Sequence, residues 1–135
     1  MSVEQLIRRV VQTLPPEATC MEAANLMSQE SIGTVVVVDG DLPVGIITDR
    51  DLIVRVMAEG RPPDKTQIQE VMSGDPIVLE GDRSMDDVIS TMRNERIRRL
   101  IVVDDDGRLE GLVSSDDLLS IVASQLTDLT EAIEP

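Results

Sequence analysis

Two short hydroxyl–carboxylate pairs carry the chemistry that this chain offers. Thr48 is followed three residues later by Asp51, and Ser114 is followed in the same way by Asp117, 66 positions further on. Each pair comes after an apolar run and opens a segment with helical spacing, so it is expected where a strand ends and a helix begins. Free backbone N–H groups at a helix start favour an anion, and a carboxylate one turn later can accept hydrogen bonds from a vicinal diol. The pairs therefore predict two sites for a nucleoside phosphate.

The same pairs also fit a purely structural role. Thr and Ser are preferred helix N-caps, and an acidic residue three positions later stabilises the first turn. A single copy would favour this explanation, whereas the recurrence of the pattern at the same fold position favours binding. The residues alone leave both roles open.

The residue types that are missing argue against catalysis. The chain has no His and no Tyr, so Ser–His or Cys–His nucleophiles cannot be built. Its single Lys, Lys65, lies in a linker-like stretch. We therefore expect a noncatalytic protein without a metal or a resident cofactor, and an enzyme is disfavoured.

The lone Cys20 excludes an internal disulfide and a zinc site of the Cys/His type. A helix start would favour its thiolate, but its counterpart in the second half is Met85, which favours a small buried residue. The run Asp104–Gly107 looks like a calcium loop, yet it lacks the spaced ligands and the late Glu, so a solvated turn is expected.

The charge balance limits the partners. The net charge is -14, which opposes binding to nucleic acid or to an anionic membrane. No apolar run is long enough to span a bilayer, and the start lacks the order of a signal peptide. These features favour a cytoplasmic location.

The chain repeats itself beyond these pairs. Thr19 returns as Ser84 and the run Val35–Asp39 as Leu100–Asp104, both 65 positions later, so one residue is inserted in the following turn. A duplication at fixed spacing predicts two like units. We divide the chain into residues 1–60, with an N-terminal helix, and residues 61–135, with the linker and a C-terminal helix.

Each half is expected to read strand, helix, strand, strand, helix. The elements predicted for the first half are a helix opened by a capping box at 2–5, an extended piece at 13–14, a capped helix at 19–27, strands at 35–38 and 44–47, and a helix from 48 or 49. Those predicted for the second half are one helical turn at 66–72, a strand at 77–79, a capped helix at 84–94, strands at 100–103 and 109–113, and a helix from 115 to about 125, with a separate turn at 127–130. The fold class is therefore α/β (α+β): two β-α-β-β-α repeats with pseudo-twofold symmetry, whose sheets bury their apolar faces against each other.

The order of elements, the Val-rich strand before Asp39 and the two Gly-h-h-(Thr/Ser)-x-x-Asp motifs (h apolar) closely resemble a tandem pair of CBS domains, the Bateman-type module named after cystathionine beta-synthase. The resemblance covers about Val10 to Val122. It implies two clefts that bind adenosine compounds such as AMP, ADP, ATP or S-adenosylmethionine. It also implies a homodimer that regulates a partner protein.

The resemblance assigns roles to individual residues. Asp51 and Asp117 would bind the ribose beside Thr48 and Ser114, and Ile46 and Leu112 would line the base. Each cleft would borrow from the opposite repeat. The Asp117 cleft would take Thr13, Ala18, Ile32 and Gly33, and the Asp51 cleft would take Val78, Arg83, Ile97 and Arg98.

The two clefts differ in charge. Arg50 precedes one aspartate, with Arg83 and Arg98 nearby, whereas Asp116 precedes the other, offset by Arg99. We expect a polyphosphate nucleotide at Asp51 and a less anionic ligand, or none, at Asp117; pairing of these arginines with surface acids is the alternative. Because the chain has no aromatic residue, adenine would lie between aliphatic side chains.

The preferred function is that of a noncatalytic regulatory module binding AMP, ADP or ATP. One alternative is a dimerisation or interaction module without a ligand, with an apolar surface at 52–57 and 118–122. The other alternative is an S-adenosylmethionine sensor.

Overall fold

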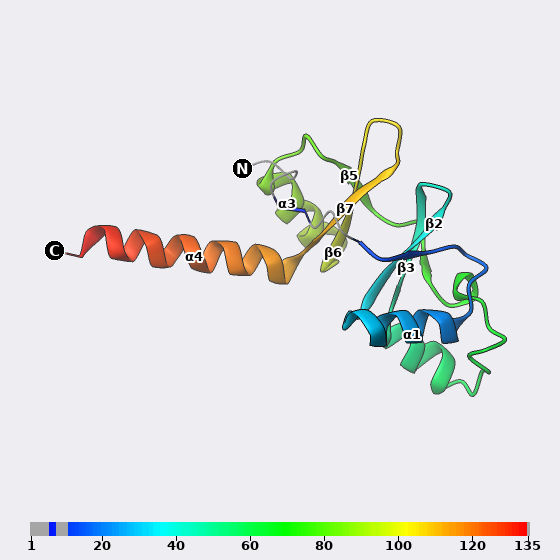
Figure 1. The fold of residues 1–135 in the computed structure, drawn as a ribbon. Helices are drawn as coiled ribbons and strands as arrows, with labels where there is room; N and C mark the ends of the chain where they lie inside the picture. Colours follow the sequence, from blue (N-terminus) through cyan, green and yellow to red (C-terminus); the bar gives the residue numbers. More distant parts are fainter. Residues whose placement is uncertain (1–5, 8–10, 135) are drawn as a thin grey trace.

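The computed structural model describes residues 6–7 and 11–134, so the capping box predicted at 2–5 lies outside the described residues. Figure 1 shows two units, each built of strands and helices, and one long helix that extends away from them. The first elements are β1 (Thr13–Leu14), α1 (Cys20–Glu30), β2 (Thr34–Asp39), β3 (Leu42–Thr48), α2 (Asp49–Asp51), the π-type helix η2 (Leu52–Met57), the 3-10 turn η3 (Ile68–Glu70) and β4 (Ser73–Gly74). The remaining elements are β5 (Val78–Glu80), α3 (Met85–Glu95), β6 (Arg99–Val103), β7 (Leu109–Ser114) and α4 (Ser115–Ile133).

The two sheets share one topology, as the repeat predicts. In the first sheet β1 pairs parallel with β2, and β2 pairs antiparallel with β3. In the second sheet β5, β6 and β7 repeat the same directions. The register shifts at equivalent places, Val37/Val38 and Val102/Val103. The duplication in the sequence is therefore a duplication of the fold.

The first sheet has a fourth strand that the sequence did not predict. β4 pairs antiparallel with β3, and Gly74 lies opposite Gly45. A strand of two residues has no alternation of apolar and polar side chains, so no pattern marks it. The first sheet therefore has the order β1-β2-β3-β4, whereas the second has only β5-β6-β7.

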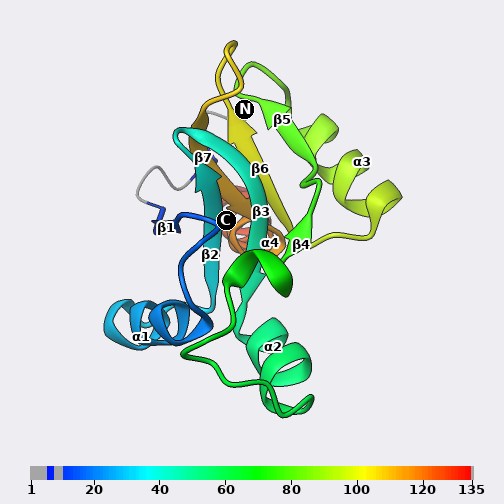
Figure 2. The ribbon, with the colours of Figure 1, turned by 90° about the vertical axis from the view of Figure 1, so that its right-hand side faces the viewer.

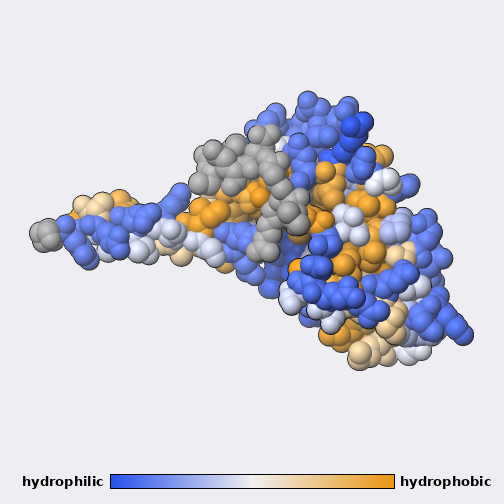
Figure 3. Space-filling view, viewed as in Figure 1, coloured by the Kyte–Doolittle hydropathy of each residue, from blue (hydrophilic) through white to orange (hydrophobic). Residues whose placement is uncertain are grey.

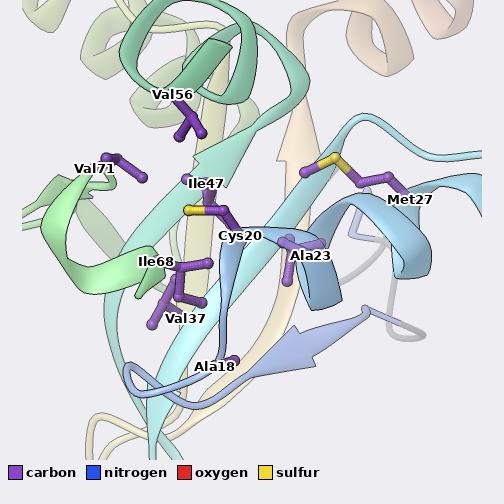
Figure 4. Close-up of a cluster of buried hydrophobic side chains, with 10 residues drawn as sticks. Ala18, Cys20, Ala23, Met27, Val37, Ile47, Val56, Ile68 and Val71 are labelled. Atoms are coloured by element: carbon purple, nitrogen blue, oxygen red, sulfur yellow. The ribbon is translucent and has the colours of Figure 1, made fainter. Parts of the chain in front are cut away.

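The central strands are buried on both faces, as their unbroken apolar runs predict. Val35 and Val37 pack under α1 in the first core, which Figure 4 shows around Cys20 and Ile47. Val36 points the other way and meets Ile101 of β6 in a third cluster between the sheets. The two sheets thus bury their free faces against each other, with α1 and α3 outside them (Figure 2).

The loops that surround the strands repeat in detail. Thr19 and Ser84 both close capping boxes. Ser31 and Arg96 both end their helices in the left-handed region, at φ 55° and 56°. This repetition places the two segments before β2 and β6 identically.

The segment between the repeats packs on the first one. The backbone N–H of Ile68 donates to the carbonyl of Ala18 at 2.8 Å, and that of Cys20 donates to Thr66 at 2.8 Å. Ile68 is fully buried in the first core. At the other end of the chain, Leu6 is buried in the second core beside Val88. Residues near the start and the middle of the chain therefore each complete a core.

The C-terminal helix is longer than predicted. The sequence indicated an end near Gln125 and a separate turn at 127–130, but α4 continues unbroken to Ile133. The hydroxyls of Thr127 and Thr130 donate to the carbonyls of Ala123 and Leu126, four residues back, so they serve the helix instead of restarting it. Within the described residues, no helix is long and apolar enough to cross a membrane.

The helix after β3 is present as expected, but only its first turn is α-helical. From Leu52 it widens, and the N–H of Ala58 donates to the carbonyl of Ile53, five residues back, at 2.8 Å. β-branched side chains at Ile53, Val54 and Val56 crowd a regular α turn. The helix of the first repeat ends at Met57.

Candidate functional site

Both predicted hydroxyl–carboxylate pairs lie where a strand meets a helix. Thr48 Oγ1 accepts from the N–H of Asp51 at 3.2 Å, and Asp51 Oδ2 accepts from the N–H of Thr48 at 2.9 Å. Ser114 Oγ likewise accepts from the N–H of Asp117 at 3.1 Å. The capping role is therefore present at both places. It does not exclude binding, because a carboxylate oxygen with one hydrogen bond keeps a second lone pair.

The helix starts are fixed by the loop before the neighbouring strand. The N–H of Asp49 donates to the carbonyl of Gly33 at 3.0 Å, and the N–H of Ser115 donates to the carbonyl of Arg98 at 2.8 Å. The two bonds are equivalent, because their donors are 66 positions apart and their acceptors 65 positions apart. Each repeat therefore presents its helix start at the same end of its sheet.

A cavity of about 460 Å³ lies at the start of α4. This volume is in the range of small-molecule sites. It is lined by residues of both repeats: Val11, Gln12, Glu30, Ser31, Ile32, Gly33, Thr34, Arg99, Leu112, Ser114, Asp116 and Asp117. The structure thus brings the predicted Asp117 pair together with residues of the first repeat.

Seven residues predicted for the Asp117 cleft line this cavity. They are Ile32, Gly33, Arg99, Leu112, Ser114, Asp116 and Asp117. Thr13 and Ala18 do not line it, because Thr13 lies on β1 and Ala18 is buried in the first core. The binding roles of all these residues remain predictions.

Sequence reasoning missed five lining residues: Val11, Gln12, Glu30, Ser31 and Thr34. Gln12 lies just before β1, where its carbonyl accepts from the N–H of Val36 at 3.1 Å. Val11 directly precedes Gln12, and Glu30, Ser31 and Thr34 lie around the left-handed turn at Ser31. The only signals for these residues were the positions of Glu30, Ser31 and Thr34 beside Ile32 and Gly33, and those of Val11 and Gln12 beside Thr13.

The charge of the cavity is mainly negative. Glu30, Asp116 and Asp117 supply carboxylates, and Arg99 supplies the one cation among the lining residues. Asp116, which the sequence analysis expected to make this cleft more acidic than the one at Asp51, is among the lining residues.

The residues predicted around Asp51 form a different arrangement. Asp51 and the arginines assigned to it line neither the cavity at Asp117 nor a second cavity beside Asp104. Asp51 lies 3.9 Å from Arg55 through Oδ1 and Nε. The side chains of Arg50, Arg83 and Arg98 are exposed, and no ion pair in the described part of the chain involves them. The other members are spread over the sheets: Ile46 on β3, Val78 on β5 and Ile97 before β6.

Two minor alternatives can be judged from the structure. Cys20 is 1% exposed and packs in the first core, and burial raises the pKa of its thiol, so its role is packing. The second cavity is lined by acidic residues including Asp104, Asp105 and Asp106. Within the described residues, however, no group of side chains is arranged to hold a metal ion.

Comparison with known proteins agrees with this architecture. The model of the CBS domain matches residues 3–58 and again residues 68–124. The chain belongs to the CBS domain family. Its CBS pair is 40% identical over 121 residues to the uncharacterized protein MK0525 of Methanopyrus kandleri, covering 89% of this chain and 62% of that protein. It is 37% identical over 117 residues to the CBS domain-containing protein YhcV of Bacillus subtilis, covering 87% of this chain and 82% of YhcV.

Solved structures share the fold of this CBS pair. A protein with CBS domains from Burkholderia ambifaria MC40-6 superposes with a TM-score of 0.81 at 32% identity, covering 93% of this chain and 96% of that one. The CBS domain pair of MJ0100, in complex with 5'-methylthioadenosine and S-adenosyl-L-methionine, gives a TM-score of 0.81 at 28% identity, covering 93% and 98%.

An enzyme also carries a similar CBS pair. The inosine-5'-monophosphate dehydrogenase of Methanocaldococcus jannaschii is 35% identical over 118 residues, but these cover only 22% of that enzyme. The likeness to the dehydrogenase is therefore confined to a small part of its length.

Proposed function

We propose that this CBS pair is a noncatalytic regulatory module that binds an adenosine compound between its repeats. The observation that carries the proposal is the cavity at Asp117, which joins Gly33 of one repeat to Ser114 and Asp117 of the other. A carboxylate at a helix start can accept hydrogen bonds from both hydroxyls of a ribose. The aliphatic side chains of Ile32 and Leu112 can contact the base. The MJ0100 pair, which resembles this chain, binds adenosine compounds.

At Asp117 the favoured ligand is an adenosine compound without a polyphosphate. Glu30 and Asp116 would repel added phosphates, whereas a neutral or cationic tail would be tolerated. This charge favours compounds of the type of S-adenosylmethionine and 5'-methylthioadenosine over ATP at this cleft.

At Asp51 the favoured ligand is an anionic nucleotide such as ADP or ATP. Arg50 and Arg98 are exposed, and a guanidinium binds phosphate through paired hydrogen bonds. Binding at either cleft would regulate a partner only if the ligand favours one arrangement of the repeats or of the copies over another.

Isothermal titration calorimetry on the full chain tests the proposal at Asp117. The chain is titrated separately with 5'-methylthioadenosine, S-adenosylmethionine, AMP and ATP, and Asp117→Asn is compared with the unaltered protein. The variant keeps the backbone N–H that Ser114 caps but loses the carboxylate charge. We expect its affinity for the two uncharged or cationic compounds to fall at least about tenfold, as loss of charge-assisted hydrogen bonds predicts.

Asp105→Asn is the matched control, because it removes the same charge from an exposed loop outside this cavity. It should bind as the unaltered chain does. Absence of heat with all four compounds, or equal loss in both variants, would reject the proposal. An interaction module without a ligand would then be the better description.

A further inference from the structure

Arg55 joins the carboxylate of Asp51 to the segment that connects the two repeats. Its Nε lies 3.9 Å from Oδ1 of Asp51, four residues earlier in the chain. Its Nη1 donates to the backbone carbonyl of Val71 at 2.8 Å. Val71 lies between η3 and β4, in the stretch that leads from the first repeat to the second. One guanidinium therefore contacts both the residue assigned to ribose binding and the connecting segment.

The carbonyl that holds Arg55 is itself fixed in place. The side chain of Val71 is buried in the first core together with Val56, and Figure 4 shows both side chains in that cluster. Two residues after Val71, Ser73 of β4 pairs with Ile46 of β3, the strand that leads to the site. Because its acceptor cannot move freely, the guanidinium of Arg55 is held beside the carboxylate.

The two oxygens of the Asp51 carboxylate have different neighbours. Oδ2 accepts from the N–H of Thr48 at 2.9 Å, and Oδ1 is the oxygen that lies 3.9 Å from Arg55. A separation of 3.9 Å is too long for a hydrogen bond, so this contact leaves the lone pairs of Oδ1 for a ligand hydroxyl. The side chain of Asp51 is only 14% exposed. Thr48 and Arg55 thus hold the carboxylate from two sides and leave one oxygen for a sugar.

A solvated surface charge is a poor explanation for Arg55. The other exposed residues of η2 are apolar: Ile53, Val54 and Met57, with exposed fractions of 56%, 46% and 74%. Figure 3 shows apolar surface along the lower edge of the module, where Figure 1 places this helix. In the second repeat the 66-residue spacing aligns Arg55 with Ile121, which packs against the second core. The repeated fold therefore does not require an arginine at this position.

We propose that Arg55 positions Asp51 so that this cleft distinguishes ribose from 2′-deoxyribose. The inference rests on the proposed function, in which Asp51 binds the sugar of a nucleotide. A carboxylate that is already fixed loses less freedom when the ligand binds, so each hydrogen bond to it contributes more to affinity. The 2′-hydroxyl, which only ribose carries, is one of the two sugar donors to such a carboxylate. Arg55 acts through Asp51 and is a positioning residue.

Isothermal titration calorimetry on the full chain with ATP and with 2′-deoxy-ATP tests this role. The unaltered chain should bind ATP at least about tenfold more tightly than 2′-deoxy-ATP, because the missing hydroxyl removes a hydrogen bond to a charged group. In Arg55→Ile, which introduces the residue of the second repeat, this ratio should fall to about threefold or less. Arg55→Lys should lower the ratio as well, because an ammonium lacks the planar fork that contacts Val71 and Asp51 together. Loss of charge alone would weaken both nucleotides equally and leave the ratio unchanged.

Arg61→Ile is the matched control, because Arg61 holds Glu70 of the same connecting segment at 2.7 Å. It should keep the ratio of the unaltered chain, and melting curves by circular dichroism check that every variant is folded. If the unaltered chain binds neither nucleotide, the proposed function at Asp51 is rejected, and this inference with it. If nucleotide binds without a preference for ribose, or if both isoleucine variants change the preference equally or not at all, the inference alone is overturned.

Discussion

Thr48 and Asp51 hold each other through two reciprocal hydrogen bonds at the start of α2. Thr48 Oγ1 accepts from the N–H of Asp51 at 3.2 Å, and Asp51 Oδ2 accepts from the N–H of Thr48 at 2.9 Å. The pair that the sequence offers for ribose binding is thus also a capping box. Stability and binding can be separated by experiment.

Thr48→Ala should lower the free energy of unfolding by about 1 kcal/mol, as loss of an N-cap hydroxyl typically does. Thr48→Ser keeps the hydroxyl, so its free energy of unfolding should fall much less. Urea unfolding followed by circular dichroism measures both. Equal stability of the two variants would show that the cap contributes nothing.

Arg50 and Arg98 should contribute to the binding of nucleotide phosphates at the Asp51 cleft. We expect Arg50→Ala and Arg98→Ala each to weaken ADP and ATP binding by about tenfold, because each removes a guanidinium that can bind phosphate. Calorimetry measures the effect. Arg108→Ala is the control, since Arg108 precedes β7 at the opposite end of that strand from Ser114. Unchanged ADP and ATP affinity in the first two variants would contradict the assignment.

Gly45 is required for the docking of β4. A Cβ at this position would lie 2.5 Å from Sδ of Met72 and 2.8 Å from the carbonyl oxygen of Ser73. Gly45→Ala should therefore destabilise the protein by about 1–3 kcal/mol, the usual cost of overpacking. Its register partner is the control, because a Cβ at Gly74 meets no atom within 4 Å. Thermal melts that fall equally for Gly45→Ala and Gly74→Ala would be inconsistent with this packing.

Cys20 should make stability depend on alkaline pH. Burial raises the pKa of its thiol, with Arg61 lowering it and Glu70 raising it to smaller extents. An unfolded thiol titrates near pH 8.5, so above about that pH the unfolded state releases a proton that the folded state retains. The free energy of unfolding should therefore fall as pH rises from about 7.5 to about 9.5.

Cys20→Ala should remove this part of the pH dependence of the free energy of unfolding. Urea unfolding at the two pH values compares the chains. A fall in the free energy of unfolding that is as large in the variant as in the unaltered protein, or larger, would refute the role of the thiol.

Periodicity predicted most elements because their signals are local. The Val-rich run before Asp39 indicated a strand buried on both faces, and Val36 does face the second sheet while Val35 and Val37 face α1. The caps at Thr19 and Ser84 were predicted from three-residue spacing, which is a property of a single turn. Features that depend on distant partners were missed, such as β4, which is a strand only because β3 lies beside it.

The duplication, the two helix starts and the absence of histidine chemistry follow from residue type and spacing, so they could be predicted from the amino-acid order. Which residues meet depends on the packing of the two repeats in the tertiary structure. The tertiary structure joined Glu30 and Gln12 to Asp117 in one cavity, whose lining does not include Asp51 or the arginines assigned to it. It also extended α4 past the module, because Thr127 and Thr130 bond back into the helix. Spacing specifies local hydrogen bonds, whereas a cavity depends on how two separately specified units pack.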